Sequence, residues 1–167
     1  MIALKNILVP TDFGKAAETA LTYARTLART FGATLHVLHV TDGTYMNAGG
    51  VEMYTATASD FRHDINEAAS KELKELVLDN DNSGPAITPA ILTSRRPALA
   101  IVDYAKQQDI DLIVMGTHGR GPLAHMVMGS VAERVVRLAP CPVMTVRHPE
   151  HEFVMPDALV RVSSLPA

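Results

Sequence analysis

The chain has 167 residues, of which 47% are apolar and 20% are charged. This length corresponds to one domain, and the composition is that of a globular protein and excludes a largely disordered chain. With 15 basic against 18 acidic residues the net charge is −3, so there is no basic excess for binding nucleic-acid phosphates.

In the N-terminal part of the chain, apolar runs of strand length alternate with a segment of helical periodicity. Lys5–Pro10 and Thr34–Val40 are the runs, and they predict strands buried on both faces. Between them, Gly14–Phe31 has a helical pattern, and Gly32 suits a left-handed helix end. The apolar stripe of that helix comprises Ala17, Ala20, Leu21, Ala24, Leu27, Ala28 and Phe31.

The middle of the chain contains a polar segment, a helix and a strand. Thr41–Thr57 is polar and contains glycine, so we expect a loop, and Ser59 is suited to cap a following helix. The apolar stripe of that helix comprises Phe61, Ile65, Ala68, Ala69, Leu73, Leu76 and Val77. After turn residues at Asp79–Pro85, Ala86–Leu92 predicts a third strand. Pro89 places it at the edge of the sheet, because proline cannot donate to a central ladder.

The C-terminal part completes an alternating pattern. Pro97–Gln108 predicts a helix, Asp111–Gly116 a buried strand, Gly129–Ala139 a last helix and Pro142–Arg147 a fifth strand. We therefore expect a single-domain, doubly wound, parallel five-stranded sheet with right-handed crossovers, a Rossmann-like α/β fold. The domain covers residues 1–147, and 148–167 is expected to be a C-terminal tail or an arm packing on this subunit or a neighbour.

Several features predict a cytoplasmic protein with no membrane span. The first ten residues, MIALKNILVP, lack the basic segment and long apolar run of a signal peptide. The apolar runs are far shorter than the ~20 residues that cross a bilayer. The single cysteine, Cys141, cannot form an internal disulfide, which fits a reducing compartment.

Two strand ends carry residues suited to a ligand site. In an open α/β sheet, ligands bind at the carboxyl ends of strands, near the point where the strand order reverses. Pro10, Thr11 and Asp12 directly follow the first predicted strand. The glycine-bearing segment 116–130, GTHGRGPLAHMVMGS, follows the fourth. We expect these two segments to lie at the same edge of the sheet.

The glycine spacing of segment 116–130 suits a phosphate chain. Its pattern is Gly116-x2-Gly119-x9-Gly129-Ser130. Glycines let backbone N–H groups approach phosphate oxygens, and the helix that begins after them favours an anion at its N-terminus. Arg120 adds a charge-assisted contact. Together these residues form a plausible triphosphate cradle.

The same residues also have a purely structural interpretation. Ser130 and Glu133 fit a capping box, the glycines then serve a turn, and Asp12 is suited to cap the first helix. The segment lacks the lysine and spacing of a P-loop, GxxxxGK[ST]. It also fits the glycine-rich Rossmann fingerprint poorly, because Pro122 lies within the matching stretch. From spacing alone, both interpretations stay open.

Two stretches resemble the universal stress protein family. Val114–Arg147, VMGTHGRGPLAHMVMGSVAERVVRLAPCPVMTVR, resembles its C-terminal signature, and Lys5–Phe13, KNILVPTDF, resembles its first strand and ligand-contacting turn. The GxxGx9G[ST] spacing is the mark of that family's ATP-binding branch. The resemblance covers residues 1 to about 147. It implies an adenine nucleotide alpha hydrolase-like fold and a stress-response sensor or regulator.

The resemblance further implies a site for ATP with Mg²⁺ and a homodimer paired through the last strand, Pro142–Arg147. The matching positions are Pro10, Thr11 and Asp12 at base and ribose, Val40 against adenine, Met115 and Gly116 closing the pocket, His118, Gly119 and Arg120 in the phosphate loop, and Gly129, Ser130 and Val131 at the helix start. One departure is Thr93–Pro97, TSRRP, where relatives often have a glycine; Arg95 and Arg96 could close part of the pocket or add phosphate charge.

The other reactive side chains suggest weaker hypotheses. His36 and His39 are an odd number of residues apart on one strand, so they face opposite sides and cannot share a metal ion. His118 with His125, and the tail segment 148–152, contain ligand types without a fixed geometry. Cys141 is expected to be a small buried residue, because nothing basic adjoins it.

Three functions follow from these patterns. The first is an ATP-binding sensor with at most slow hydrolysis, because the sequence offers no set of nucleophile, base and orienting group. The second is a protein-interaction module of the same fold that binds no nucleotide. The third is an enzyme that uses ATP to activate a substrate. It is the weakest, because such enzymes usually have a glycine- and serine-rich loop where this chain has Pro10–Phe13.

Overall fold

The computed structural model describes residues 3–41, 55–78, 84–117 and 130–148, with the backbone alone at 55–65 and 78. Their elements alternate along the chain as the sequence predicts. They are β1 (Asn6–Thr11), α1 (Lys15–Phe31), β2 (Thr34–Thr41), α2 (Thr55–Leu78), β3 (Ile87–Thr93), α3 (Pro97–Gln107), β4 (Leu112–Gly116), α4 (Ser130–Leu138) and β5 (Val143–Val146).

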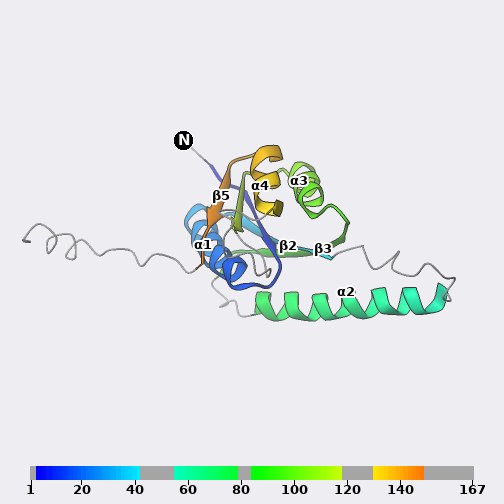
Figure 1. The fold of residues 1–167 in the computed structure, drawn as a ribbon. Helices are drawn as coiled ribbons and strands as arrows, with labels where there is room; N and C mark the ends of the chain where they lie inside the picture. Colours follow the sequence, from blue (N-terminus) through cyan, green and yellow to red (C-terminus); the bar gives the residue numbers. More distant parts are fainter. Residues whose placement is uncertain (1–2, 42–54, 79–83, 118–129, 149–167) are drawn as a thin grey trace, which may run out of the picture.

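The strands form one parallel sheet in the order β3-β2-β1-β4-β5. Figure 1 shows α1 and α2 on one face of the sheet and α3 and α4 on the other. This confirms the predicted doubly wound α/β fold. It also confirms the edge position of β3, where Pro89 pairs with Val37 on the inner side.

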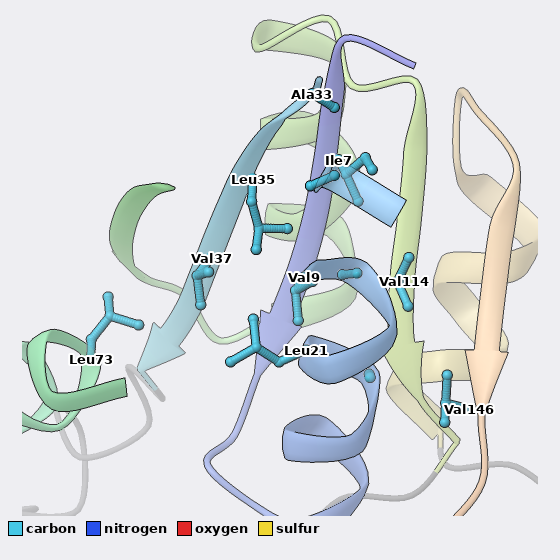
Figure 2. Close-up of a cluster of buried hydrophobic side chains, with 12 residues drawn as sticks. Ile7, Val9, Leu21, Ala33, Leu35, Val37, Leu73, Val114 and Val146 are labelled. Carbon is cyan, nitrogen blue, oxygen red and sulfur yellow. The ribbon is translucent and has the colours of Figure 1, made fainter. Parts of the chain in front are cut away.

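Alternate residues of each central strand enter two aliphatic cores. Ile7 and Val9 of β1 face α1 and α2, together with Leu21 and Leu73 (Figure 2). Leu8, between them, faces α3 and α4. All three β1 side chains are fully buried, and each such burial stabilises the fold by about 1.5–3 kcal/mol. Burial on both faces explains why β1 is a continuous apolar run.

Helix α1 packs closely on the sheet through small residues. Ala20, Ala24 and Ala28 are completely buried, and Gly32 ends the helix in the predicted left-handed conformation, with φ 66° and ψ 31°. The prediction that Phe31 belongs to the buried stripe is wrong, because its side chain is 44% exposed. Phe31 is the last helical residue, and the buried stripe ends one turn earlier.

Helix α2 differs most from its prediction. It begins at Thr55, so Ser59 lies inside the helix and does not cap it. The predicted loop Thr41–Thr57 is therefore too long at its C-terminal end. Ala69 and Leu73 are buried as expected, whereas Ala68 is exposed, since one residue along a helix turns the side chain by about 100° away from that face. The side chains of Phe61 and Ile65 lie outside the described residues. Among the helices described, none is long and apolar enough to cross a membrane.

Candidate functional site

The strand order reverses between β1 and β4. From β1 the chain proceeds to β2 and β3 on one side, then crosses to β4 and β5 on the other. The β1–β2 register continues to the last residue of β1, Thr11↔His39, whereas the β1–β4 register consists of Ile7↔Leu112 and Leu8↔Ile113. The ladder between β1 and β4 therefore ends before the carboxyl ends of both strands. This is the position at which open α/β sheets bind ligands.

The turn after β1 is fixed by side chain–backbone hydrogen bonds. The Phe13 N–H donates to Thr11 Oγ1 and the Gly14 N–H donates to Asp12 Oδ1, each at 3.0 Å. Asp12 does not cap α1 as predicted; Gly14 occupies the N-cap position, with φ −85° and ψ 164°. The carboxylate instead acts two residues earlier, where it closes a turn typical of aspartate.

Phe13 adopts a left-handed backbone conformation with φ 61°. For a residue other than glycine this conformation costs roughly 1–2 kcal/mol. The Phe13 ring lies against the His39 ring, with the centroids 4.5 Å apart and the planes tilted by 35°. A residue held in such a conformation at a strand end is typical of functional turns.

Gly116 lies where β4 passes beneath the start of α1. A Cβ at this position would lie 2.7 Å from Ala16 Cβ and 2.9 Å from the Ala16 carbonyl carbon. Glycine is therefore required here for close packing of the helix on the strand. The structural interpretation of the sequence expected Gly116 to serve a turn; a close approach between elements is the reason instead.

Three of the predicted site residues belong to one apolar cluster on the α3 and α4 face. Met115 is buried in it, and Val40 and Val131 are half-buried against it. They come from β4, β2 and α4, three elements that are far apart in the sequence. The fold thus places these three predicted positions on the same face of the sheet. Pro10, which is buried, precedes Thr11 at the neighbouring strand end.

Of the residues predicted to hold the phosphates, the structure describes Ser130 and Val131. His118, Gly119, Arg120 and Gly129 lie outside the described residues. Ser130 is exposed and is the first residue of α4, one residue after the predicted start of this helix. The N–H groups of a first helical turn have no partner within the helix and favour an anion.

The predicted capping box is not formed. Glu133 forms an ion pair with Arg137, one turn further along α4, at 2.8 Å. Within the described part of the chain no hydrogen bond joins Glu133 to Ser130. Because both charged side chains are largely exposed, the pair contributes about 0.3–0.5 kcal/mol.

The segment Thr93–Pro97 forms its turn with hydroxyl groups where a glycine was expected. The hydroxyls of Thr41 and Thr93 lie 2.8 Å apart, and the Ser94 N–H donates to Thr41 O. Ser94 Oγ then accepts from the Arg96 N–H at 3.0 Å, directly before α3. The side chains of Arg95 and Arg96 are exposed.

His36 and His39 confirm the predicted alternation along β2. His36 Nδ1 lies 3.0 Å from Tyr104 Oη on the α3 face. His39 Nδ1 lies 2.8 Å from Thr11 O on the opposite face. The sequence pattern raised His39 only as a possible metal ligand and did not indicate its contact with the β1 turn. The available signal was its place opposite Thr11 at the end of the next strand.

The other candidate reactive groups have structural surroundings. Burial raises the pKa of the Cys141 thiol, and the negative charge of Asp111 raises it further, so this cysteine is not activated. His148 lies 3.4 Å from Thr19 Oγ1. Over the residues that the structure describes, no three metal-binding side chains cluster. His125 and the tail residues beyond His148 lie outside those residues.

We expect the stability of the protein to decrease below pH 6.5 because of His36. Burial lowers the pKa of this imidazole below its usual 6.5, so in acid the unfolded chain binds a proton that the folded protein resists. The stability that neutral His36 contributes is fully present above pH 6.5. It is lost as the pH falls through the lowered pKa of His36 in the folded protein. Urea unfolding at pH 7.5 and 5.5 measures this, and His36→Phe should reduce the difference. An unchanged difference in the variant would assign it to other groups.

Comparison with known proteins identifies the family to which this fold belongs. The model of the universal stress protein family matches residues 3–147, and the chain belongs to this family. A universal stress protein of Methanocaldococcus jannaschii is 32% identical over 148 residues, covering 89% of this chain and 85% of the relative.

Solved structures of family members superpose on this fold. The universal stress protein UspA from Lactobacillus plantarum matches with a TM-score of 0.70 and 30% identity, over 88% of this chain and 100% of that one. A universal stress protein from Archaeoglobus fulgidus, described as a complex with dAMP, matches with a TM-score of 0.59 and 26% identity, over 87% and 99%.

Proposed function

We propose that this protein binds ATP with Mg²⁺ at the carboxyl ends of β1 and β4 and acts as a cytoplasmic stress-response sensor or regulator. Two observations carry the proposal: the β1–β4 ladder stops before the carboxyl ends of both strands, and Val40, Met115 and Val131 belong to the apolar cluster on one face of the sheet. The dAMP complex of the Archaeoglobus fulgidus relative supports an adenine nucleotide as the ligand class.

The proposed site divides into a base part and a phosphate part. Pro10, Thr11 and Asp12 would meet the base and ribose, Val40 would face the adenine ring, and Met115 and Gly116 would close the pocket. The N-terminus of α4, with Gly129, Ser130 and Val131, and the residues His118, Gly119 and Arg120 would hold the phosphates. Mg²⁺ would neutralise part of the phosphate charge. Hydrolysis of the bound ATP would be slow at most, and residues 148–167 would form a C-terminal tail outside the domain.

One observation favours the second function, an interaction module that binds no nucleotide. Gly116, one of the glycines of the phosphate-type spacing, is explained by its packing against Ala16 and does not need a ligand. If the other two glycines were equally structural, the spacing would carry no information about phosphate. The two functions therefore make opposite predictions for nucleotide binding.

We expect calorimetric titration of nucleotide-stripped protein with Mg·ATP to show saturable binding at one ATP per subunit. AMP should bind more weakly, because it lacks the distal phosphates, and GTP measures selectivity for the base. An equal affinity for AMP and ATP would remove the phosphate part of the site. Absence of binding heat and of a thermal shift with every nucleotide would favour the interaction module.

We also propose a homodimer through β5, which lies at one edge of the sheet (Figure 1). Ile113 and Thr117 donate their N–H groups to Pro142 O and Val146 O. By the alternation of a strand, the backbone groups of Val143 and Thr145 point away from β4, toward the open edge. Pro89 protects the opposite edge, whereas the exposed side chains of Val136 and Leu138 add apolar surface on α4.

Thr145→Pro is expected to convert the dimer to a monomer. The substitution removes an outward N–H group that the ladder with β4 does not use, so the subunit should stay folded. Sedimentation velocity measures the mass, and circular dichroism checks the fold. Thr145→Ala, which keeps the outward N–H group, is the control for loss of the threonine side chain. A Thr145→Pro protein that remains dimeric would place the interface elsewhere.

A further inference from the structure

The nucleotide-facing turn after β1 depends on a residue that would not itself touch the ligand. Thr11 and His39 are opposite each other in the β1–β2 register, at the last position of that register. His39 Nδ1 lies 2.8 Å from Thr11 O, and Thr11 Oγ1 in turn accepts from the Phe13 N–H. The His39 side chain thus adds a hydrogen bond between β2 and β1 at the end of their ladder, next to the turn that follows β1.

The geometry determines which ring nitrogen carries the proton. A carbonyl oxygen can only accept a hydrogen bond, so His39 Nδ1 must donate to Thr11 O. The same ring packs against the Phe13 ring at a centroid separation of 4.5 Å. One side chain therefore contacts the turn twice, once through a hydrogen bond and once through its face.

We propose that His39 is a positioning residue for nucleotide binding, because it holds Phe13 in its left-handed conformation and thereby presents Asp12 to the ligand. Phe13 has φ 61°, an unfavourable conformation for an aromatic residue, so contacts around it must compensate. Its contacts include the Thr11 hydroxyl, the His39 ring and the apolar cluster on the α1 face, and the His39–Thr11 hydrogen bond holds the ring in place. This inference rests on the proposed ATP site.

Three variants separate the two contacts of His39. His39→Ala removes both, His39→Asn keeps a donor near the position of Nδ1, and His39→Phe keeps an aromatic ring without a donor. His36→Phe is the matched control. It removes an imidazole from the same strand, but on the opposite face, where the partner is Tyr104. A variant that only loses stability should behave like this control.

We expect His39→Ala to weaken ATP binding about tenfold, because the competent turn is then a minor fraction of the molecules. AMP should lose affinity by the same factor, since the turn is assigned to base and ribose. His39→Asn should recover most of the loss, and His36→Phe should bind as the wild type does. Calorimetric titration of each variant gives these ratios.

A measurement without ligand keeps this proposal distinct from the proposed function. The amides of Phe13 and Gly14 donate the two hydrogen bonds of the turn, so their hydrogen exchange reports its closure. Exchange should accelerate about tenfold in His39→Ala and not in His36→Phe. Unchanged exchange and affinity in His39→Ala would overturn the positioning role. A wild type that binds no nucleotide would overturn the ATP site, and the exchange rates would still decide whether His39 holds the turn.

Discussion

Gly116→Ala is expected to lower the free energy of unfolding by about 1–3 kcal/mol, the usual cost of forcing an extra methyl group into a close-packed contact. The new Cβ would lie 2.7 Å from Ala16 Cβ and 2.9 Å from the Ala16 carbonyl carbon. Backbone cannot move aside as the end of a flexible side chain can, so α1 must shift away from β4. Urea unfolding of the wild type and the variant measures the difference.

The contact with Ala16 provides the control. In an Ala16→Gly background one of the two close contacts is absent, so Gly116→Ala should cost less there, although the carbonyl carbon at 2.9 Å still limits the rescue. Ala16→Gly itself costs up to about 1 kcal/mol, as glycine does in a helix. Strictly additive effects would show that the clash is relieved by other movements. A Gly116→Ala protein of full stability would contradict the packing argument outright.

The fold was largely predictable because its signals are local. Continuous apolar strands, helical stripes and Gly32 each act over a few residues, and Pro89 alone places β3 at the edge of the sheet. The start of α2 was not predictable in this way. Ser59 is a good capping residue, but the helix has already begun at Thr55. Capping preference shows where a helix can begin and does not show whether earlier residues are helical.

The sequence selected candidate site residues, but it did not give the physical reasons for the local structure around them. Sequence resemblance selected Val40, Met115 and Val131, and the structure brings these residues from three elements to one cluster. The reason for Gly116 is its approach to Ala16, a contact between residues 100 positions apart in the sequence, which no local pattern encodes. The backbone of Phe13 and its support by His39 likewise depend on the register between two strands.

Gly129→Asp is expected to weaken ATP binding by at least about 100-fold. Gly129 directly precedes α4, whose first residue is Ser130, so a carboxylate there would stand where the proposed phosphates meet the helix N-terminus. Two unit charges 4 Å apart near a protein surface repel by about 4 kcal/mol, and a triphosphate carries several charges. The repulsion therefore exceeds the roughly 2.7 kcal/mol that corresponds to 100-fold. Calorimetric titration with Mg·ATP measures the loss.

The same substitution should leave the fold intact, which makes the loss of binding interpretable. Aspartate is among the best residues before a helix, and its charge is favourable at a helix N-terminus, so the free energy of unfolding should stay level or rise by a few tenths of a kcal/mol. Gly129→Asn is the matched control, with nearly the same shape and capping ability but no charge. If charge decides, the asparagine variant keeps most of the affinity. An equal loss in both variants would mean that the phosphates need the bare glycine backbone, and full affinity in both would move the phosphates away from α4.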